Sequence, residues 1–231
     1  MGKIINCNKS VDVGINGLCT QCGTIHNLKL FPQTENDVKI NFNNMREYKK
    51  AEKIAGYGNK SDRSKGDFYP TPSFVLFPIL EKENFEGTIL EPCCGEGHIS
   101  KELLSKGFDV TSRDLFDRGY GETGIDFLFM PQPKTFDNII TNPPYNLALE
   151  FAQTSLIVAK KKVALLMKIN FLEGVKRKTF LENSPLKYVY VFSKRQTLTR
   201  PDWEGKNKGF ITYAWFVWEI GYEGETIIKW L

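Results

Sequence analysis

The sequence predicts an α/β fold with a mostly parallel sheet that ends in an antiparallel edge hairpin. Short apolar runs alternate with helical stretches from about residue 67 onward, which is the pattern of βαβ units. A glycine-rich turn follows the first apolar run and precedes a helix, as in doubly wound folds. Two aromatic and β-branched runs close this part of the chain with a polar stretch between them, so they favour an antiparallel pair.

Each element is expected from its hydrophobic spacing. Residues 74–83 have the spacing of an amphipathic helix, and residues 162–167 are nearly all apolar, as in a buried strand. In chain order we expect helix 74–83, strand 88–90, helix 99–105, strand 109–112, a third strand region at 127–128, strand 138–141, helix 147–159, strand 162–167, and strands 188–192 and 210–220.

Composition divides the chain into three parts. Residues 1–30 are rich in Asn, Gly, Cys and Thr, and residues 31–66 combine a helical stretch with a glycine-punctuated linker. Residues 67–231 carry the α/β pattern. The chain of 231 residues is long enough for one α/β domain with a small appendage.

The first part carries a predicted metal site. Cys19 and Cys22 form a CxxC followed by glycine, and Cys7 and His26 lie on either side of them. Together these residues supply three sulfurs and one nitrogen, a set suited to a closed tetrahedral Zn²⁺ site. A short polar segment gains stability from such a site. The alternative is free cysteines in a surface arm.

Bulk properties exclude several classes of protein. No apolar run approaches the ~18 residues of a membrane span, and the N-terminus lacks the features of a secretory signal. We therefore expect no membrane contact and a cytoplasmic location. The net charge of +4 is compatible with a polyanionic partner without requiring one.

Asn142, Pro143, Pro144 and Tyr145 follow the strand expected at 138–141, where two prolines force the chain to turn. The carboxyl edge of a parallel sheet is a usual place for a ligand. There the Asn142 amide oxygen and the Pro143 carbonyl can accept hydrogen bonds from one NH2 group, and Tyr145 offers a face for stacking. The stretch therefore predicts a socket for an exocyclic amine on a ring. The alternative is turn punctuation with Tyr145 as a core anchor.

The turn after the first strand predicts a second binding feature. Gly95 and Gly97 allow a tight turn and close approach of a ligand. Glu91, at the strand end, repels pyrophosphate and favours a cationic group such as the amino group of a methionine moiety.

Acidic residues after the next strands extend this feature. Asp114 is placed to accept two ribose hydroxyls, and Asp126 with Phe127 offers an acceptor and an apolar face for an adenine ring. The ligand that these groups describe is a nucleoside with a positively charged amino-acid tail and no phosphates.

With these motifs the chain resembles the class I S-adenosylmethionine-dependent methyltransferases. More narrowly, it resembles the amino-methyltransferases that modify adenine N6 or cytosine N4 in DNA. The resembling blocks are Phe-Tyr-Pro-Thr-Pro at 68–72, Glu-Pro-Cys-Cys-Gly-Glu-Gly at 91–97, Asp114, Asp126 with Phe127, and Asn-Pro-Pro-Tyr at 142–145. The resemblance implies a Rossmann-like, seven-stranded sheet, S-adenosylmethionine as methyl donor, and a bacterial or phage context. It also implies methylation of a DNA base, with adenine N6 as the expected target, after base flipping.

The resemblance also assigns residues to roles. The catalytic motif is Asn142, Pro143, Pro144 and Tyr145. The residues implied to bind the cofactor are Tyr69, Thr71, Pro72, Glu91, Pro92, Cys93, Gly95, Gly97, Asp114, Asp126, Phe127 and Asn142. The block at 68–72 is implied to lie against the methionine end of the cofactor. Cys93 and Cys94 replace residues that are often small or apolar, so buried packing is the role expected of the pair.

Other residues are candidates for substrate contact. Phe171 follows the strand at 162–167 and could form a second stacking face, with core filling as the alternative. Cations and an aromatic between the last two strands suit phosphate contact and base wedging, although an exposed hairpin has similar composition. These residues are Lys194, Arg195, Arg200 and Trp203. Duplex DNA is therefore the expected partner, with RNA as the alternative.

Two further hypotheses about the function stay open. Asn-Pro-Pro-Tyr also occurs in enzymes that methylate guanine in ribosomal RNA or a glutamine amide in release factors, and the block at 68–72 argues against both. A non-catalytic adaptor would keep the fold and use the zinc segment to bind a partner, and the intact acidic and Asn-Pro-Pro-Tyr residues argue against that. Nothing in the chain is large enough to be a target-recognition domain, which favours a homodimer or a partner subunit.

Overall fold

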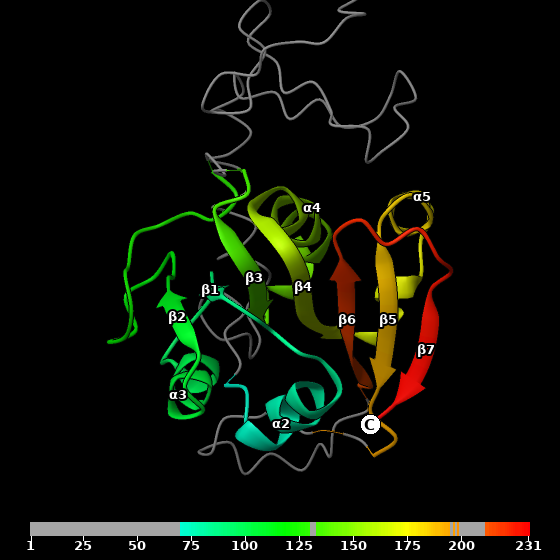
Figure 1. Ribbon diagram of the computed structural model, residues 1–231. Helices are drawn as coiled ribbons and strands as arrows, with labels where there is room; N and C mark the ends of the chain where they lie inside the picture. The colour runs from blue at the N-terminus through cyan, green and yellow to red at the C-terminus, as the bar shows by residue number, and fades with distance from the viewer. Residues whose placement is uncertain (1–69, 130–132, 195, 197, 199–210) are drawn as a thin grey trace, which may run out of the picture. The chain divides into compact units, whose positions relative to one another are not determined.

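One mixed sheet organises the part of the chain that the computed structural model describes, which is residues 70–129, 133–194, 196, 198 and 211–231. In this part the sheet has seven strands in the order β2-β1-β3-β4-β6-β5-β7 (Figure 1). Their bounds are β1 Thr88–Glu91, β2 Asp109–Ser112, β3 Phe136–Thr141, β4 Ala159–Lys168, β5 Leu186–Val191, β6 Tyr213–Glu219 and β7 Ile227–Trp230. The chain divides after Phe42, and all the described residues belong to the second unit.

One strand of this seven-stranded sheet, β6, runs opposite to the other six. Strands β2, β1, β3 and β4 are parallel, and β6 runs antiparallel to both β4 and β5. The outermost strand, β7, pairs with β5 in parallel. The parallel half therefore gathers the carboxyl ends of β1, β2 and β3 at one edge, where a ligand site is expected in such folds.

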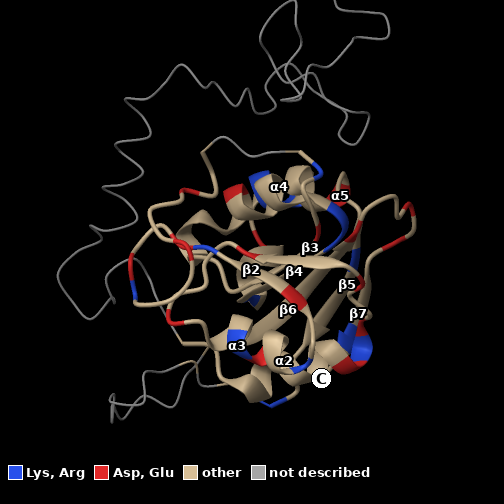
Figure 2. Ribbon diagram, turned by 60° about the vertical axis from the view of Figure 1, so that its left-hand side comes forward, with Lys and Arg blue, Asp and Glu red and all other residues tan. Residues whose placement is uncertain are grey.

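Helices cover both faces of the sheet. Figure 2 shows α2 and α3 on one side of it and α4 and α5 on the other. The bounds are α2 Ser73–Lys82, α3 His98–Ser105, α4 Ala148–Val158 and α5 Val175–Glu182, with short 3-10 turns η1 Tyr145–Leu147 and η2 Ile169–Leu172. Alternating side chains of the buried strands meet the two helical layers, since successive residues of a strand point to opposite faces.

The core beneath α2 and α3 shows this alternation. Leu76 and Ile79 of α2 and Leu103 of α3 pack in one cluster with Ile140 of β3 and Leu166 of β4. All five side chains are buried almost completely. Burying apolar side chains on this scale is the main stabilising contribution to the fold, at ~1.5–3 kcal/mol for each large one.

A buried polar cluster fastens α2 to the sheet. The Glu83 carboxyl, just beyond the last turn of α2, accepts hydrogen bonds from the Tyr190 hydroxyl at 2.6 Å and from the Lys162 ammonium at 2.7 Å. The indole of Trp215 also donates to the Val75 carbonyl at 2.9 Å. These bonds satisfy buried groups and fix α2 against β4, β5 and β6. They therefore hold in place the residues that precede α2, which enter the functional site.

Most expected elements are confirmed. The helix expected at 74–83 is α2, the strand at 109–112 is β2, and the antiparallel pair is β5 with β6. The strand region expected at 127–128 is a turn instead, because the Asp126 carboxylate accepts a hydrogen bond from the Leu128 amide at 2.9 Å and closes the backbone locally. The seventh strand is β7, whose four residues were too short a run to stand out in the sequence. No helix in the described ranges combines the length and the apolar character needed to cross a membrane.

Candidate active site

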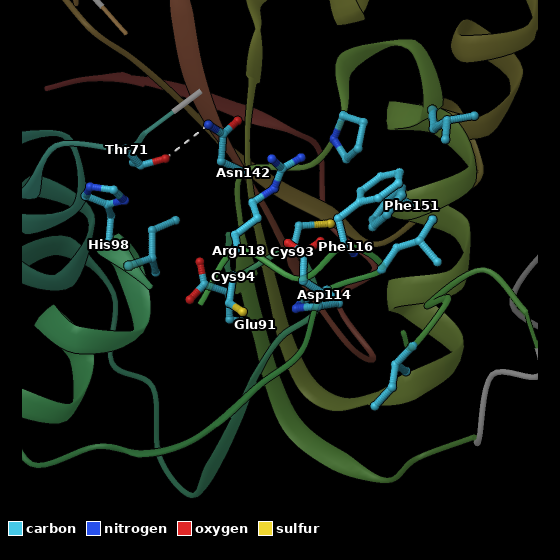
Figure 3. Close-up of a pocket in the computed structure, with 16 residues that line it drawn as sticks. Thr71, Glu91, Cys93, Cys94, His98, Asp114, Phe116, Arg118, Asn142 and Phe151 are labelled. Atoms are coloured by element: carbon cyan, nitrogen blue, oxygen red, sulfur yellow. Dashed lines mark hydrogen bonds between the residues drawn. The ribbon is translucent and has the colours of Figure 1, made fainter. Parts of the chain in front are cut away.

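A pocket opens where β1, β2 and β3 end (Figure 3). Glu91 is the last residue of β1, Asp114 lies two residues after β2, and Asn142 follows β3 directly. Neighbouring parallel strands thus bring together three residues that are up to 51 positions apart in the sequence. The pocket is lined by Thr71, Glu91, Pro92, Cys93, Cys94, His98, Ile99, Asp114, Leu115, Phe116, Arg118, Ile125, Asn142, Pro144, Leu147 and Phe151.

The glycine turn between β1 and α3 contributes Pro92, Cys93 and Cys94 to the pocket wall, whereas Gly95 and Gly97 are not among the lining residues. Gly95 and Gly97 have φ values of +55° and +81°, a region that L side chains rarely adopt. A Cβ atom on Gly97 would lie 2.4 Å from the Tyr120 ring. Glycine is therefore required at position 97 both by backbone conformation and by the ring that covers it.

Glu91 is a buried acid at the centre of a short hydrogen-bond chain. Its side chain is 1% exposed and accepts a hydrogen bond from the Ser100 hydroxyl. Ser112 in turn donates to Ser100 at 2.6 Å. Burial raises the pKa of Glu91 from 4.5 to about 8, more than the Ser100 hydrogen bond lowers it. A cationic group in the pocket would reverse that effect, so this carboxyl is suited to an ammonium ligand.

Asp114 ties the two turns of the pocket together. One carboxylate oxygen accepts a hydrogen bond from the Gly95 backbone amide at 2.8 Å, and the other accepts one from the Phe116 backbone amide at 2.8 Å. Each oxygen keeps further acceptor capacity, which suits a pair of ligand hydroxyls. The aromatic side chains of Phe116 and Phe151 line the pocket beside it, so this side of the pocket fits a flat ring.

The two cysteines of the turn are neutral at physiological pH. Burial raises the pKa of the Cys93 thiol well above its ordinary value and that of Cys94 to about 12. The Cys94 sulfur lies 3.6 Å from the Tyr120 carbonyl and is 3% exposed. Both therefore act as small packing groups, and Cys93 also contributes to the pocket wall.

Asn142 is joined to the segment before α2. Its amide nitrogen donates to the Thr71 hydroxyl oxygen at 3.0 Å, and Thr71 is only 4% exposed. Figure 3 shows the amide oxygen on the other side of the group, away from Thr71. Pro72 caps α2 with an extended backbone, so the chain passes directly from this contact into the helix. The predicted target motif and the predicted cofactor block are thus in contact.

Tyr145 lies next to Asn142 but belongs to the edge of the core. Its ring centroid is 5.7 Å from that of Tyr213, and the Lys168 ammonium lies 4.7 Å from the ring centre. This aromatic pair fits a core anchor, and the cation marks one face of the ring. The predicted stacking role of Tyr145 stays a prediction.

The remaining candidates lie in different places. Phe171 is 2% exposed and meets Phe216 edge-on at 5.3 Å, which fits the core-filling alternative. Asp126 and Phe127 are not among the lining residues of the pocket. The Phe127 ring centroid is 5.4 Å from that of Phe151, and Ile125 is the lining residue of that turn. Lys194 is exposed.

Several predictions concern residues outside the described ranges. These are the zinc set Cys7, Cys19, Cys22 and His26, the cofactor residue Tyr69, and the substrate residues Arg195, Arg200 and Trp203. Within the described ranges, no group of three His, Cys, Asp or Glu residues could hold a metal ion.

The pocket also contains residues that the sequence did not single out. His98 begins α3, and Arg118 approaches the Phe116 ring at 5.5 Å. Leu147 and Phe151 are four positions apart, so their helical spacing after the Asn-Pro-Pro-Tyr stretch was an available signal. Arg118 carried no such signal, because the loop after β2 brings it back over the pocket only in the folded chain.

Comparison with known proteins supports the fold. No protein-family model matches the chain, and no curated protein matches it in sequence. Among solved structures, a modification subunit assigned to a type I restriction enzyme of Vibrio vulnificus YJ016 superposes with a TM-score of 0.51 at 13% identity, over 78% of this chain and 48% of its own. The type I restriction-modification system methyltransferase subunit of Streptococcus thermophilus gives 0.50 at 15% identity, over 74% and 47%.

A Listeria monocytogenes protein assigned to the class I S-adenosylmethionine-dependent methyltransferases is similar to the same degree. Its TM-score is 0.50 at 14% identity, over 68% of this chain and 63% of its own. The chain thus spans about half to just under two thirds of these proteins. The described part of the chain has the Rossmann-like fold of class I S-adenosylmethionine-dependent methyltransferases.

Proposed function

We propose that the protein transfers a methyl group from S-adenosylmethionine to the exocyclic amine of a base in nucleic acid, with adenine N6 in duplex DNA as the target. The observation that carries this proposal is the position of Asn142. It adjoins a pocket whose far side offers Asp114 and aromatic walls and whose interior holds the buried Glu91. Cofactor chemistry and amine recognition are therefore combined in one site.

The residues present fit S-adenosylmethionine. Asp114 has acceptor capacity for ribose hydroxyls, Phe116 and Phe151 provide apolar walls for adenine, and Glu91 suits the ammonium of the methionine end. When bound, S-adenosylmethionine supplies an electrophilic methyl group on a sulfonium sulfur. Glu91 and Asp114 do not suit a phosphate ligand, because Asp114 would repel it and Glu91 supplies no positive charge to pair with it.

Asn142 and Pro143 perform the recognition step. The exocyclic amine of a base is a weak nucleophile because its lone pair is delocalised into the ring. Two acceptors, the Asn142 amide oxygen and the Pro143 carbonyl, would bind its two N–H groups and stabilise the positive charge that develops on nitrogen. No strong base is required, since the proton can leave after transfer, and catalysis depends mainly on alignment.

Nucleic acid is supported as the substrate by the chain's chemistry. Lys168 lies above the Tyr145 ring beside Asn142, and Lys194 is exposed where β5 ends, so both could contact a phosphate backbone. Two of the similar structures are subunits of restriction-modification systems, which is consistent with DNA. Adenine N6 is the narrower part of the proposal and rests on the Asn-Pro-Pro-Tyr stretch with the block at 68–72.

The test uses purified full-length protein with methyl-labelled S-adenosylmethionine. Duplex DNA, single-stranded DNA and total RNA are offered separately, and the products are digested to nucleosides and identified by mass. Label in N6-methyladenine from duplex DNA is the expected result. Label only in RNA would overturn the substrate and keep the chemistry, whereas label in none of them would contradict the proposal and favour the adaptor reading.

A further inference from the structure

The Thr71–Asn142 hydrogen bond depends on which end of the Asn142 side-chain amide faces Thr71. An asparagine amide has an acceptor oxygen and a donor NH2 group of nearly equal shape, and hydrogen-bond partners decide which end points where. In this structure the NH2 end faces Thr71 at 3.0 Å. The oxygen end therefore faces the other way, as recognition of an amine requires. A flipped amide would present NH2 to the target amine, and two donors would then oppose each other.

Thr71 alone does not determine this choice. A hydroxyl both donates and accepts, so Thr71 could bind either end of the Asn142 amide. It acts only as an acceptor toward Asn142 when its own hydrogen is donated to a third group. Thr71 is 4% exposed and lines the pocket, so a pocket ligand is a suitable third group.

The ligand group that meets Thr71 follows from the layout of the pocket. Figure 3 places Thr71 and His98 on one side of the pocket and Phe116 and Phe151 on the other. An adenine ring at the aromatic side leaves the amino-acid end for the side of Thr71. His98 lines that side too, and its Nδ1 atom has no hydrogen-bond partner among the described residues. A carboxylate there would accept the Thr71 hydrogen.

We infer that Thr71 is a positioning residue through which the carboxylate end of the cofactor fixes the Asn142 amide with its oxygen toward the target amine. A bound carboxylate takes the Thr71 hydrogen, Thr71 then only accepts from Asn142, and Asn142 only accepts from the target. Cofactor binding thereby prepares the site for an amine. This inference rests on the proposed function and deepens it.

The test reads the Asn142 amide directly by nuclear magnetic resonance. The full chain is labelled with ¹⁵N-asparagine, and the Asn142 side-chain signals are identified as those missing from Asn142→Asp. S-adenosylhomocysteine is compared with 5′-methylthioadenosine, which has the same adenosine and no amino-acid end. At saturation the first should slow solvent exchange of the Asn142 NH2 hydrogens roughly fivefold more than the second, the size expected for one firmer hydrogen bond. Equal effects of the two ligands would overturn the inference.

Variants separate positioning from structure. Thr71→Ser keeps the hydroxyl and should keep the difference between the two ligands, whereas Thr71→Val should abolish it. Thr154→Val is the matched control, because Thr154 is also buried, at 6% exposed, and does not line the pocket. A ligand difference that persists in Thr71→Val would contradict the inference.

Calorimetry with the wild-type chain distinguishes failure of the proposed function from failure of the positioning role of Thr71. If S-adenosylhomocysteine does not bind at all, the proposed function fails and the inference fails with it. If it binds and the Asn142 signals respond equally to both ligands, the inference alone fails.

Discussion

The predicted cofactor half and the predicted target half of the site are built differently. In the cofactor half, Glu91, Gly95 and Asp114 are linked to each other or to nearby residues by several short hydrogen bonds within 25 positions of sequence. In the target half, Asn142 donates a hydrogen bond to Thr71, which is 71 positions away in the sequence. Tyr145 packs against Tyr213, and Phe171 packs against Phe216. Binding residues that contact near neighbours in the sequence can be predicted from local motifs. Residues brought together from distant parts of the sequence depend on tertiary packing, which local motifs do not reveal.

The largest expected effect concerns Phe171, which decides whether the target half is core or binding surface. Phe171→Ala should lower the free energy of unfolding by ~3–5 kcal/mol, because a buried aromatic is removed beside Phe216. Denaturant unfolding measures this. Leu172→Ala, at a 40% exposed neighbour, is the control and should cost much less. Unchanged stability with weaker nucleic-acid binding would instead assign Phe171 to base stacking.

The next effect concerns Asn142, the link between the halves. Asn142→Ala should reduce methyl transfer about 100- to 1,000-fold, since one preorganised acceptor at the reacting group is lost. Loss of the hydrogen bond to the buried Thr71 hydroxyl should lower the free energy of unfolding by ~1–3 kcal/mol and leave the protein folded. Asn146→Ala, at an exposed position four residues on, should retain activity. Label incorporation at saturating cofactor gives the comparison, and undiminished transfer by Asn142→Ala would remove it from the chemistry.

A smaller effect tests the rigidity of the cofactor half. Gly97→Ala should destabilise the fold by ~2–4 kcal/mol, because its Cβ would meet the Tyr120 ring at 2.4 Å and φ is +81°. Gly107→Ala has a similar φ of +84° with nothing within 4 Å, so it should cost only ~1–2 kcal/mol. The difference between their thermal midpoints isolates the overlap with Tyr120. Equal losses would mean that the ring moves aside freely.

The smallest expected effect is a pH dependence of stability and of ligand binding, which follows from the raised pKa of Glu91, about 8 against an ordinary 4.5. The folded chain keeps a proton that the unfolded chain releases between these values, so the free energy of unfolding falls as pH rises from 4.5 to about 8. An ammonium ligand lowers this pKa, and binding of S-adenosylhomocysteine at pH 7 should release a proton.

Glu91→Gln should lose both the fall in stability with rising pH and the proton release on ligand binding. It should also bind S-adenosylhomocysteine about tenfold more weakly, the size of one charge-assisted hydrogen bond. Calorimetry in buffers of different ionisation enthalpy measures the proton release, and thermal unfolding from pH 5 to 8 measures the stability. Proton release that is the same in the variant would assign it to another group.

The positions at the strand ends could be located from the sequence, although their roles stay predictions. Glu91 ends β1, Asp114 lies two residues after β2 and Asn142 follows β3, and neighbouring parallel strands bring such positions to one edge of the sheet. The sequence was less informative where tertiary contacts decide. Arg118 lines the pocket from a loop without regular periodicity. Phe127 contacts Phe151 without lining the pocket, whereas Ile125, two positions earlier, does line it. β7 joins the sheet by pairing with β5, and a pattern of only four residues is too short to predict that pairing.

We propose that Asn142 and the cofactor pocket form one site, and a crystal structure of the protein with S-adenosylhomocysteine would show whether they do. We predict the ribose at Asp114, the ammonium at Glu91, the carboxylate at Thr71 and the sulfur facing Asn142. A ligand that binds elsewhere, or that lies in the pocket with its sulfur turned away from Asn142, would contradict the claim.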